Sequence, residues 1–92
     1  MSSVAEGTFE IINALGLHAR AAAQLVQVAN RYKSEVTLLC EGQKANAKSI
    51  MGVLMLAAAQ GMEVTVTCKG DDAEACLQDI QKLIANRFGE SK

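Results

Sequence analysis

The hydrophobic pattern of this chain changes period several times, and this alternation constrains the fold more than any other feature of the sequence. In residues 62–69 every second side chain is apolar, the period of a strand with one buried face. In residues 18–32 the apolar side chains recur about every 3.6 residues, the period of an amphipathic helix. Glycine marks the boundaries between segments, because the sequence contains no proline.

The same two periods define the other elements. The pattern predicts strands at 8–13, 35–40 and 44–46 and helices at 49–59 and 71–88. We expect Gly61 to cap the first of these two helices, and Asp71 with Glu74 to form a capping box at the start of the second. The predicted order of elements along the chain is therefore β-α-β-β-α-β-α.

This order predicts an α+β fold, an open-faced β-sandwich with a four-stranded antiparallel sheet and three helices on one face. The opposite face of the sheet is expected to meet water, because it carries charged and hydroxyl side chains: Glu35, Thr37, Glu63, Thr65 and Thr67. The chain has 92 residues, half of them hydrophobic, which is enough for one core. We therefore expect residues 1–92 to form a single domain.

The charge balance excludes several classes of partner. The chain has nine basic and ten acidic residues, a net charge of −1, whereas nucleic-acid binding and a polybasic membrane anchor both need a basic surface. No apolar run has the length of a membrane span, and residues 1–6 lack the features of a signal peptide. These observations predict a cytoplasmic protein that neither inserts into membranes nor binds nucleic acid.

The cysteines are predicted to be structural. Cys40, Cys68 and Cys76 are odd in number, and no two of them form a C-x-x-C pair. This spacing disfavours a zinc site or a redox dithiol, and with them a small ferredoxin-like metal-binding module. We expect three reduced thiols that behave as small core residues.

The segment Gly16–Arg20 contains the candidate site. His18 is the only histidine, and it lies where the strand pattern gives way to the helix pattern, with the cation Arg20 two residues later. A helix start has unpaired N–H groups and the positive end of the helix dipole, so it favours anions and phosphate in particular. A histidine there need be no more than a helix cap or a surface side chain. The convergence with Gly16 and Arg20 instead predicts a residue that receives a phosphoryl group on a ring nitrogen.

Two longer stretches carry a family resemblance. GLHARAAAQLV and NAKSIMGVLMLAAAQG resemble the HPr family, the histidine-containing phosphocarriers of the phosphoenolpyruvate-dependent sugar phosphotransferase system, and the resemblance extends from Thr8 to Phe88. It implies that His18 accepts the phosphoryl group on Nδ1 from an enzyme I type donor and passes it to enzyme IIA type acceptors, with Arg20 stabilising the phosphate. It also implies a carrier without a cofactor, rather than an enzyme with turnover of its own. Ala21 departs from the family pattern, which usually has proline there, and this leaves the helix start and the transfer rate open.

The resemblance also assigns roles around the second predicted helix. Ser49 is expected to be its N-cap and, by resemblance to KSIMGV, a regulatory phosphorylation site for a serine kinase/phosphorylase. Ile50, Met51 and Leu54 are expected to dock partner proteins, and we expect a monomer. A nitrogen-branch phosphocarrier with the same chemistry remains an alternative, although KSIMGV and the apolar helix favour the sugar branch. A purely regulatory protein of the same fold would lack the active histidine.

Overall fold

The computed structural model describes residues 3–92 and contains the predicted order of strands and helices. Its elements are β1 (Ser3–Glu10), α1 (Ala19–Ala29), β2 (Glu35–Cys40), β3 (Gln43–Asn46), α2 (Ile50–Met55), β4 (Glu63–Gly70) and α3 (Ala73–Ala85), followed by a short 3-10 helix (Arg87–Gly89).

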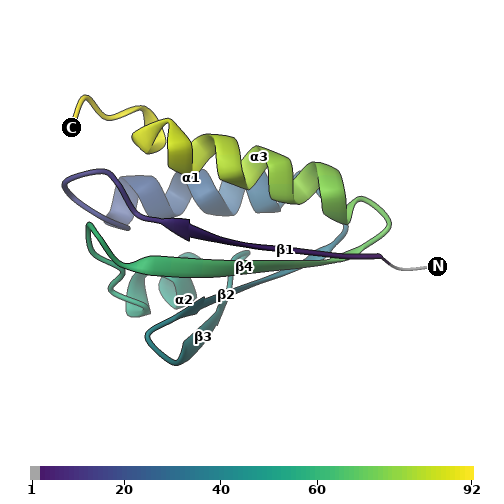
Figure 1. Ribbon diagram of the computed structural model, residues 1–92. Helices are drawn as coiled ribbons and strands as arrows, with labels where there is room; N and C mark the ends of the chain where they lie inside the picture. Colours follow the sequence, from purple (N-terminus) through teal and green to yellow (C-terminus); the bar gives the residue numbers. More distant parts are fainter. Residues whose placement is uncertain (1–2) are drawn as a thin grey trace.

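The four strands form one antiparallel sheet in the order β1-β4-β2-β3 (Figure 1). On β2 and β4 alternate side chains are at most 2% exposed: Val36, Leu38, Cys40, Val64, Val66 and Cys68. These side chains pack against the apolar stripes of α1 and α3, and the intervening residues face away from the helices. The predicted α+β fold, with a four-stranded antiparallel sheet and three helices, is confirmed.

The three cysteines are core residues, as predicted. Cys40 lies on β2, Cys68 on β4 and Cys76 on α3, each at most 1% exposed and free of disulfide bonds. Burial raises the pKa of all three thiols, with that of Cys68 at about 12. At neutral pH they are therefore protonated, apolar side chains.

The first strand differs from its predicted range. β1 begins at Ser3 instead of residue 8 and ends at Glu10, and Ser3 pairs with Gly70 of β4. It is an edge strand, and its apolar Val4 is 61% exposed, so no clean alternation marks its first half. Ile11 leaves the sheet but stays buried, and its backbone bonds the turn before β4 through Met62 and Gly61.

The ends of all three helices were also predicted wrongly. α3 ends at Ala85 instead of residue 88, and a separate 3-10 helix follows it. α2 ends at Met55 instead of residue 59, because Ala57 has a φ of +50° and the carbonyl of Ala58 accepts a hydrogen bond from Leu17. Gly61 lies in the turn before β4 and does not cap α2. α1 likewise ends at Ala29, three residues before its predicted end.

The capping box predicted for α3 does not form. Asp72, not Asp71, is the N-cap, and its side chain makes no capping bond. Its carboxylate instead accepts from the backbone N–H groups of Lys33 and Ser34, at 2.9 and 3.0 Å, and from the Ser34 hydroxyl. These bonds hold the pKa of Asp72 below its usual range, with the Ser34 side chain the largest influence. A long-range contact between the entry to β2 and α3 has replaced a local cap.

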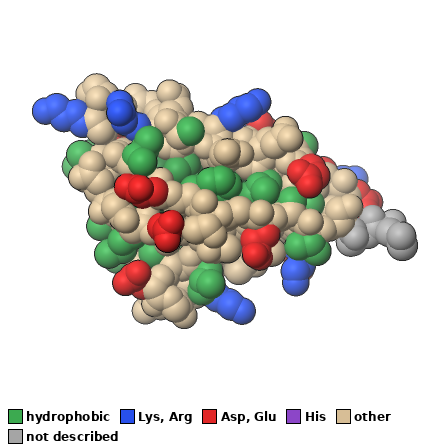
Figure 2. Space-filling view, in the orientation of Figure 1, with side chains coloured by type: hydrophobic (Ala, Val, Ile, Leu, Met, Phe, Trp, Pro, Cys, Tyr) green, Lys and Arg blue, Asp and Glu red, His purple; other side chains and the backbone are tan. Residues whose placement is uncertain are grey.

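Acidic and basic side chains are both present on the face of the molecule shown in Figure 2. Figure 2 shows acidic side chains spread across the middle of this face, with basic side chains nearer its upper and lower margins. Such a surface differs from the continuous basic face of a nucleic-acid-binding protein. None of the helices within residues 3–92 combines the length and the apolar character needed to cross a bilayer.

Candidate active site at the start of α1

A glycine fixes the loop that leads from β1 to α1. Gly16 has a φ of +66°, a conformation that favours glycine, and a Cβ there would lie 2.5 Å from the carbonyl oxygen of Ala58. The same carbonyl accepts a hydrogen bond of 2.9 Å from the N–H of Leu17. The loop is therefore held against the segment after α2, and this contact sets the position of His18.

His18 is the N-cap residue of α1, as its place in the sequence predicted. Its backbone is extended, with φ −74° and ψ 177°, and its carbonyl accepts the N–H of Ala22 at 2.8 Å. Its side chain makes no capping bond and is 28% exposed, so the ring is partly accessible to solvent. The first turn of α1 contains no acidic residue that would neutralise the positive end of the helix.

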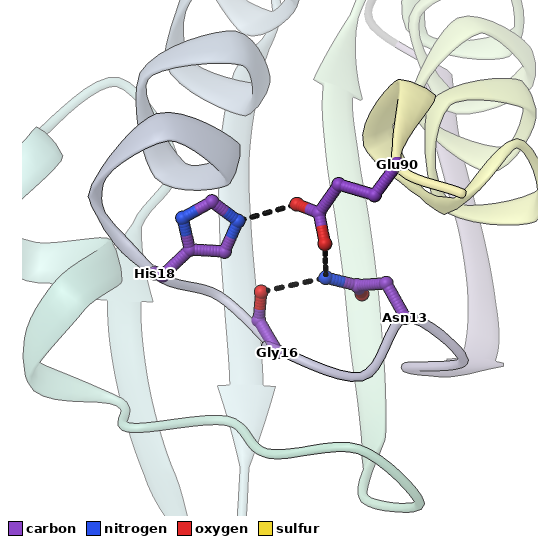
Figure 3. A network of polar contacts seen from close by, with 4 residues as sticks. All are labelled: Asn13, Gly16, His18 and Glu90. Atoms are coloured by element: carbon purple, nitrogen blue, oxygen red, sulfur yellow. Dashed lines mark hydrogen bonds and ion pairs between the residues drawn. The ribbon is translucent and has the colours of Figure 1, made fainter. Parts of the chain in front are cut away.

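A carboxylate from the far end of the chain binds the imidazole. Nε2 of His18 contacts Oε2 of Glu90, and Oε1 of Glu90 accepts from Nδ2 of Asn13 at 3.1 Å (Figure 3). Nδ2 of Asn13 also donates to the carbonyl of Gly16 at 2.9 Å. The hydrogen bond from His18 is the main reason that the pKa of Glu90 lies below its ordinary value, followed by the bond from Asn13. This network leaves Nδ1 of His18 on the ring edge that faces away from Glu90.

Arg20 lies close to this network without being paired. It is exposed and lines a surface hollow together with Leu15 and the segment 89–92. Its charge contributes to the lowered pKa of Glu90, yet no carboxylate within residues 3–92 forms a salt bridge with it. The guanidinium is thus available to an incoming anion.

Ala21, where the resemblance leads one to expect proline, is already part of the helix. α1 begins at Ala19, and Ala21 is fully buried in its first turn. Alanine has high helix propensity and keeps a backbone N–H group, which proline lacks. The helix start therefore forms without proline.

Ser49 caps α2, as predicted. Its Oγ accepts the backbone N–H of Gly52 at 3.1 Å. On the helix that follows, Ile50 and Met51 are 44% and 67% exposed, whereas Leu54 is partly buried against the core. Met55, an apolar residue of the same helix that was not among the expected docking residues, is 74% exposed. The apolar surface of α2 thus consists of Ile50, Met51 and Met55, with Leu54 at its inner margin.

Glu90 and Asn13 were missed as site residues. Glu90 is 72 positions from His18 in the sequence, and no local pattern links the two. Asn13 lies in a loop, where asparagine is common for its turn conformations alone. The one available signal was Gly89, which ends the last helical segment and allows the chain to turn back.

Comparison with known proteins identifies the family. Residues 5–86 match the family model described as the PTS HPr component phosphorylation site. Phosphocarrier protein HPr of Cupriavidus necator is 50% identical over 82 residues, covering 89% of this chain and 92% of the relative. That of Xylella fastidiosa (strain Temecula1) is 46% identical over 85 residues, covering 92% and 96%.

Other relatives bear on partners and assembly. Phosphocarrier protein NPr of Shewanella violacea is 42% identical over 81 residues, covering 88% of this chain and 89% of that protein. A crystal structure of an HPr dimer from Thermoanaerobacter tengcongensis matches with a TM-score of 0.76 at 43% identity, covering 89% and 94%. The crystal structure of HPr-C-His from the same organism matches with a TM-score of 0.92 at 42% identity, covering 96% of this chain and 99% of that one. The chain therefore belongs to the HPr family, the phosphocarriers of the phosphotransferase system, and has the open-faced β-sandwich fold of that family.

Proposed function

We propose that His18 carries the phosphoryl group, taking it on Nδ1 from a phosphoenolpyruvate-dependent donor of the enzyme I type and passing it to enzyme IIA type acceptors. The observation that supports this most is that the two ring nitrogens have different surroundings. Nε2 is engaged by Glu90, while Nδ1 lies on the other edge, at the N-cap of α1. A ring held in this way has its free lone pair at the helix start.

The transfer is balanced as a single displacement. The lone pair of Nδ1 forms the N–P bond while the bond between phosphorus and the donor breaks, and the donor leaves with that electron pair. Nε2 keeps its proton throughout. The phosphoramidate bond is labile, so the reverse displacement passes the group to an acceptor. Phosphoryl transfer depends mainly on positioning and charge stabilisation.

The surroundings of His18 suit a dianion. The unpaired N–H groups of the first turn of α1 and the helix dipole favour negative charge there. Arg20, which has no carboxylate partner within residues 3–92, supplies a guanidinium for charge-assisted bonds to the phosphate. We therefore assign Arg20 the role of stabilising the transferred group.

The direct test uses the unmodified protein with phosphoenolpyruvate and a purified enzyme I. We expect one phosphate per chain, labile in acid and stable in base, with a ³¹P resonance of a phosphohistidine substituted at Nδ1. Omitting enzyme I is the control and should leave the chain unlabelled. Phosphate that survives acid, or substitution at Nε2, would contradict the assignment.

Ser49 is proposed as a regulatory phosphorylation site for a serine kinase/phosphorylase, and Ile50, Met51 and Leu54 as the docking surface beside it. The exposure of Ile50 and Met51 supports this, because neighbouring exposed apolar side chains mark a partner surface. Met55 extends this surface. A phosphate on Ser49 would bring negative charge to an apolar contact without disturbing the helix start.

Substituting Ser49 with aspartate should weaken docking and leave the fold intact. Aspartate is a good N-cap, so melting should change little, whereas a carboxylate beside Met51 should raise the Kd for the donor about tenfold, or about 1.4 kcal/mol. Calorimetric titration of enzyme I and thermal melts measure the two effects. Ser49→Ala is the matched control, expected to lose about 1 kcal/mol of stability with the cap and to dock normally. An unchanged Kd for Ser49→Asp would remove the regulatory role.

The nitrogen branch is the second candidate, supported by the relative named phosphocarrier protein NPr. The chemistry at His18 would be the same and the partners would differ. Comparing the phosphorylation rates given by the donors of the two branches separates them.

We also propose that residues 1–92 act as one domain, as a monomer in the cytoplasm. The radius of gyration of 11.8 Å is close to the value of about 12 Å expected for a compact domain of this length. Because a solved relative is described as a dimer, light scattering over a range of concentrations is the measurement that decides the assembly.

A further inference from the structure

We propose that Glu90 is a positioning residue for His18, which selects the ring tautomer protonated at Nε2 and balances the charge that the ring gains on phosphorylation. This inference rests on the proposed function of His18. Glu90 lies beyond residues 5–86, the part of the chain that matches the family model.

The Glu90 carboxylate bridges the imidazole and the loop before it. One oxygen contacts Nε2 of His18, and the other accepts from Nδ2 of Asn13 (Figure 3). Asn13 is fully buried, and its second amide hydrogen is donated to Gly16. Its Oδ1 is buried without a partner among residues 3–92, so the amide is oriented to donate on both sides. The ring and the loop that carries it are thereby tied to a single carboxylate.

The chain holds Glu90 in place from both directions. Before it, Phe88 is 2% exposed, and the N–H of Glu90 donates to the carbonyl of Arg87 at 2.9 Å. After it, the carbonyl of Lys92 accepts from the N–H of Ala14 at 3.0 Å. The side chain of Glu90 is itself only 15% exposed. The carboxylate is thus held against the site by its neighbours in the sequence as well as by its own hydrogen bonds.

The chemistry of these groups gives the contact its effect. An ionised carboxylate only accepts hydrogen bonds, so Nε2 must be the protonated nitrogen, and in the neutral ring Nδ1 then holds the lone pair. When Nδ1 bonds to phosphorus, the ring becomes cationic, and a fixed carboxylate at Nε2 stabilises that charge as it develops. The bonds from His18 and Asn13 keep the pKa of Glu90 below its ordinary value, so the group stays ionised at neutral pH.

Glutamine is the informative substitution because it keeps the shape of the side chain but offers one oxygen and one NH₂ group. If its oxygen faces His18, its NH₂ meets the donor Nδ2 of Asn13. If its NH₂ faces His18, it favours a bare Nε2 and a proton on Nδ1, the nitrogen that must react. The first orientation breaks the bond to Asn13, and the second keeps the bridge only with the tautomer that has its proton on Nδ1.

The experiment compares Glu90→Gln with the wild type in two measurements. The ring ¹⁵N shifts of His18 report the tautomer without ambiguity, since the chain has one histidine. Single-turnover transfer from phosphorylated enzyme I reports the rate constant and the apparent affinity separately. We expect the wild-type ring to be protonated at Nε2 and the variant ring to shift toward the Nδ1–H form. The rate constant should fall about 10-fold, with the affinity nearly unchanged.

Glu35→Gln is the matched control. Glu35 is exposed at the end of the sheet where β2 pairs with Lys69, whereas the site lies beyond the other end, near the pairing of Glu10 with Glu63. In the Glu35→Gln variant, the tautomer of His18 and the rate constant of transfer should equal those of the wild type. Amide spectra of each variant establish that the fold is retained.

The outcomes separate the two proposals. Wild-type protein without phosphate on His18 overturns the proposed function and this inference with it. Wild-type protein phosphorylated on His18, together with a Glu90→Gln variant of unchanged tautomer, overturns this inference alone. The inference falls in that case whether or not the variant is slower, because it requires the tautomer to change. A changed tautomer together with a slower rate constant supports it.

Discussion

Replacing His18 with alanine should abolish phosphoryl acceptance and leave the fold in place. The imidazole is the proposed nucleophile, and no second histidine can take its role. The bond that His18 contributes to α1 comes from its backbone carbonyl, which the substitution keeps. The imidazole does not cap the helix, and Glu90 keeps its hydrogen bond from Asn13 when the ring is removed. The melting temperature should therefore move by less than about 4 °C.

Incorporation of ³²P from labelled phosphoenolpyruvate, with circular dichroism in parallel, measures both parts of this expectation. Gln27→Ala is a suitable control, because Gln27 is an exposed residue of the same helix. It should accept phosphate at the wild-type rate. Acid-labile phosphate on the His18→Ala variant would show that another residue is the acceptor.

Substituting Gly16 with alanine should have the largest effect on stability. Its φ of +66° costs an L-residue about 1–2 kcal/mol, and the new Cβ would lie 2.5 Å from the carbonyl oxygen of Ala58. The loop must move, which also weakens the bond from Leu17 to Ala58. We expect a total loss of about 2–4 kcal/mol in urea unfolding and slower phosphoryl acceptance, since the loop positions His18.

Gly42→Ala separates the two causes. Gly42 has a similar φ of +79°, but a Cβ there meets nothing within 4 Å. This variant should show the conformational loss alone, about 1–2 kcal/mol, with normal phosphoryl acceptance. Equal losses at the two positions would mean that the contact with Ala58 is easily relieved.

The sequence predicted those parts of the fold that depend on local pattern. β2 and β4 could be predicted from the sequence because each strand has one buried face, which imposes a hydrophobic period of two residues. The caps at His18 and Ser49 were readable because a helix start has its own chemistry. β1 was cut short because an edge strand need not bury every second side chain.

The features that were missed depend on contacts between distant residues. Asp72 bonds Ser34 instead of capping its own helix. α2 stops early because the segment that follows it bonds Leu17. The carboxylate partner of His18 comes from the far end of the chain. No periodicity or spacing along the chain encodes such pairs, so His18 could be found from the sequence and its setting could not.

The three buried thiols also allow local unfolding of the protein to be measured by thiol labelling. Cys40, Cys68 and Cys76 sample two strands and one helix, and each is shielded in the folded state. A thiol reagent labels such groups only when the surrounding element opens, so labelling rates record local opening free energies without an added probe. Comparing these rates before and after phosphorylation would measure how far a charge at one end of α1 changes the dynamics of the sheet beneath it.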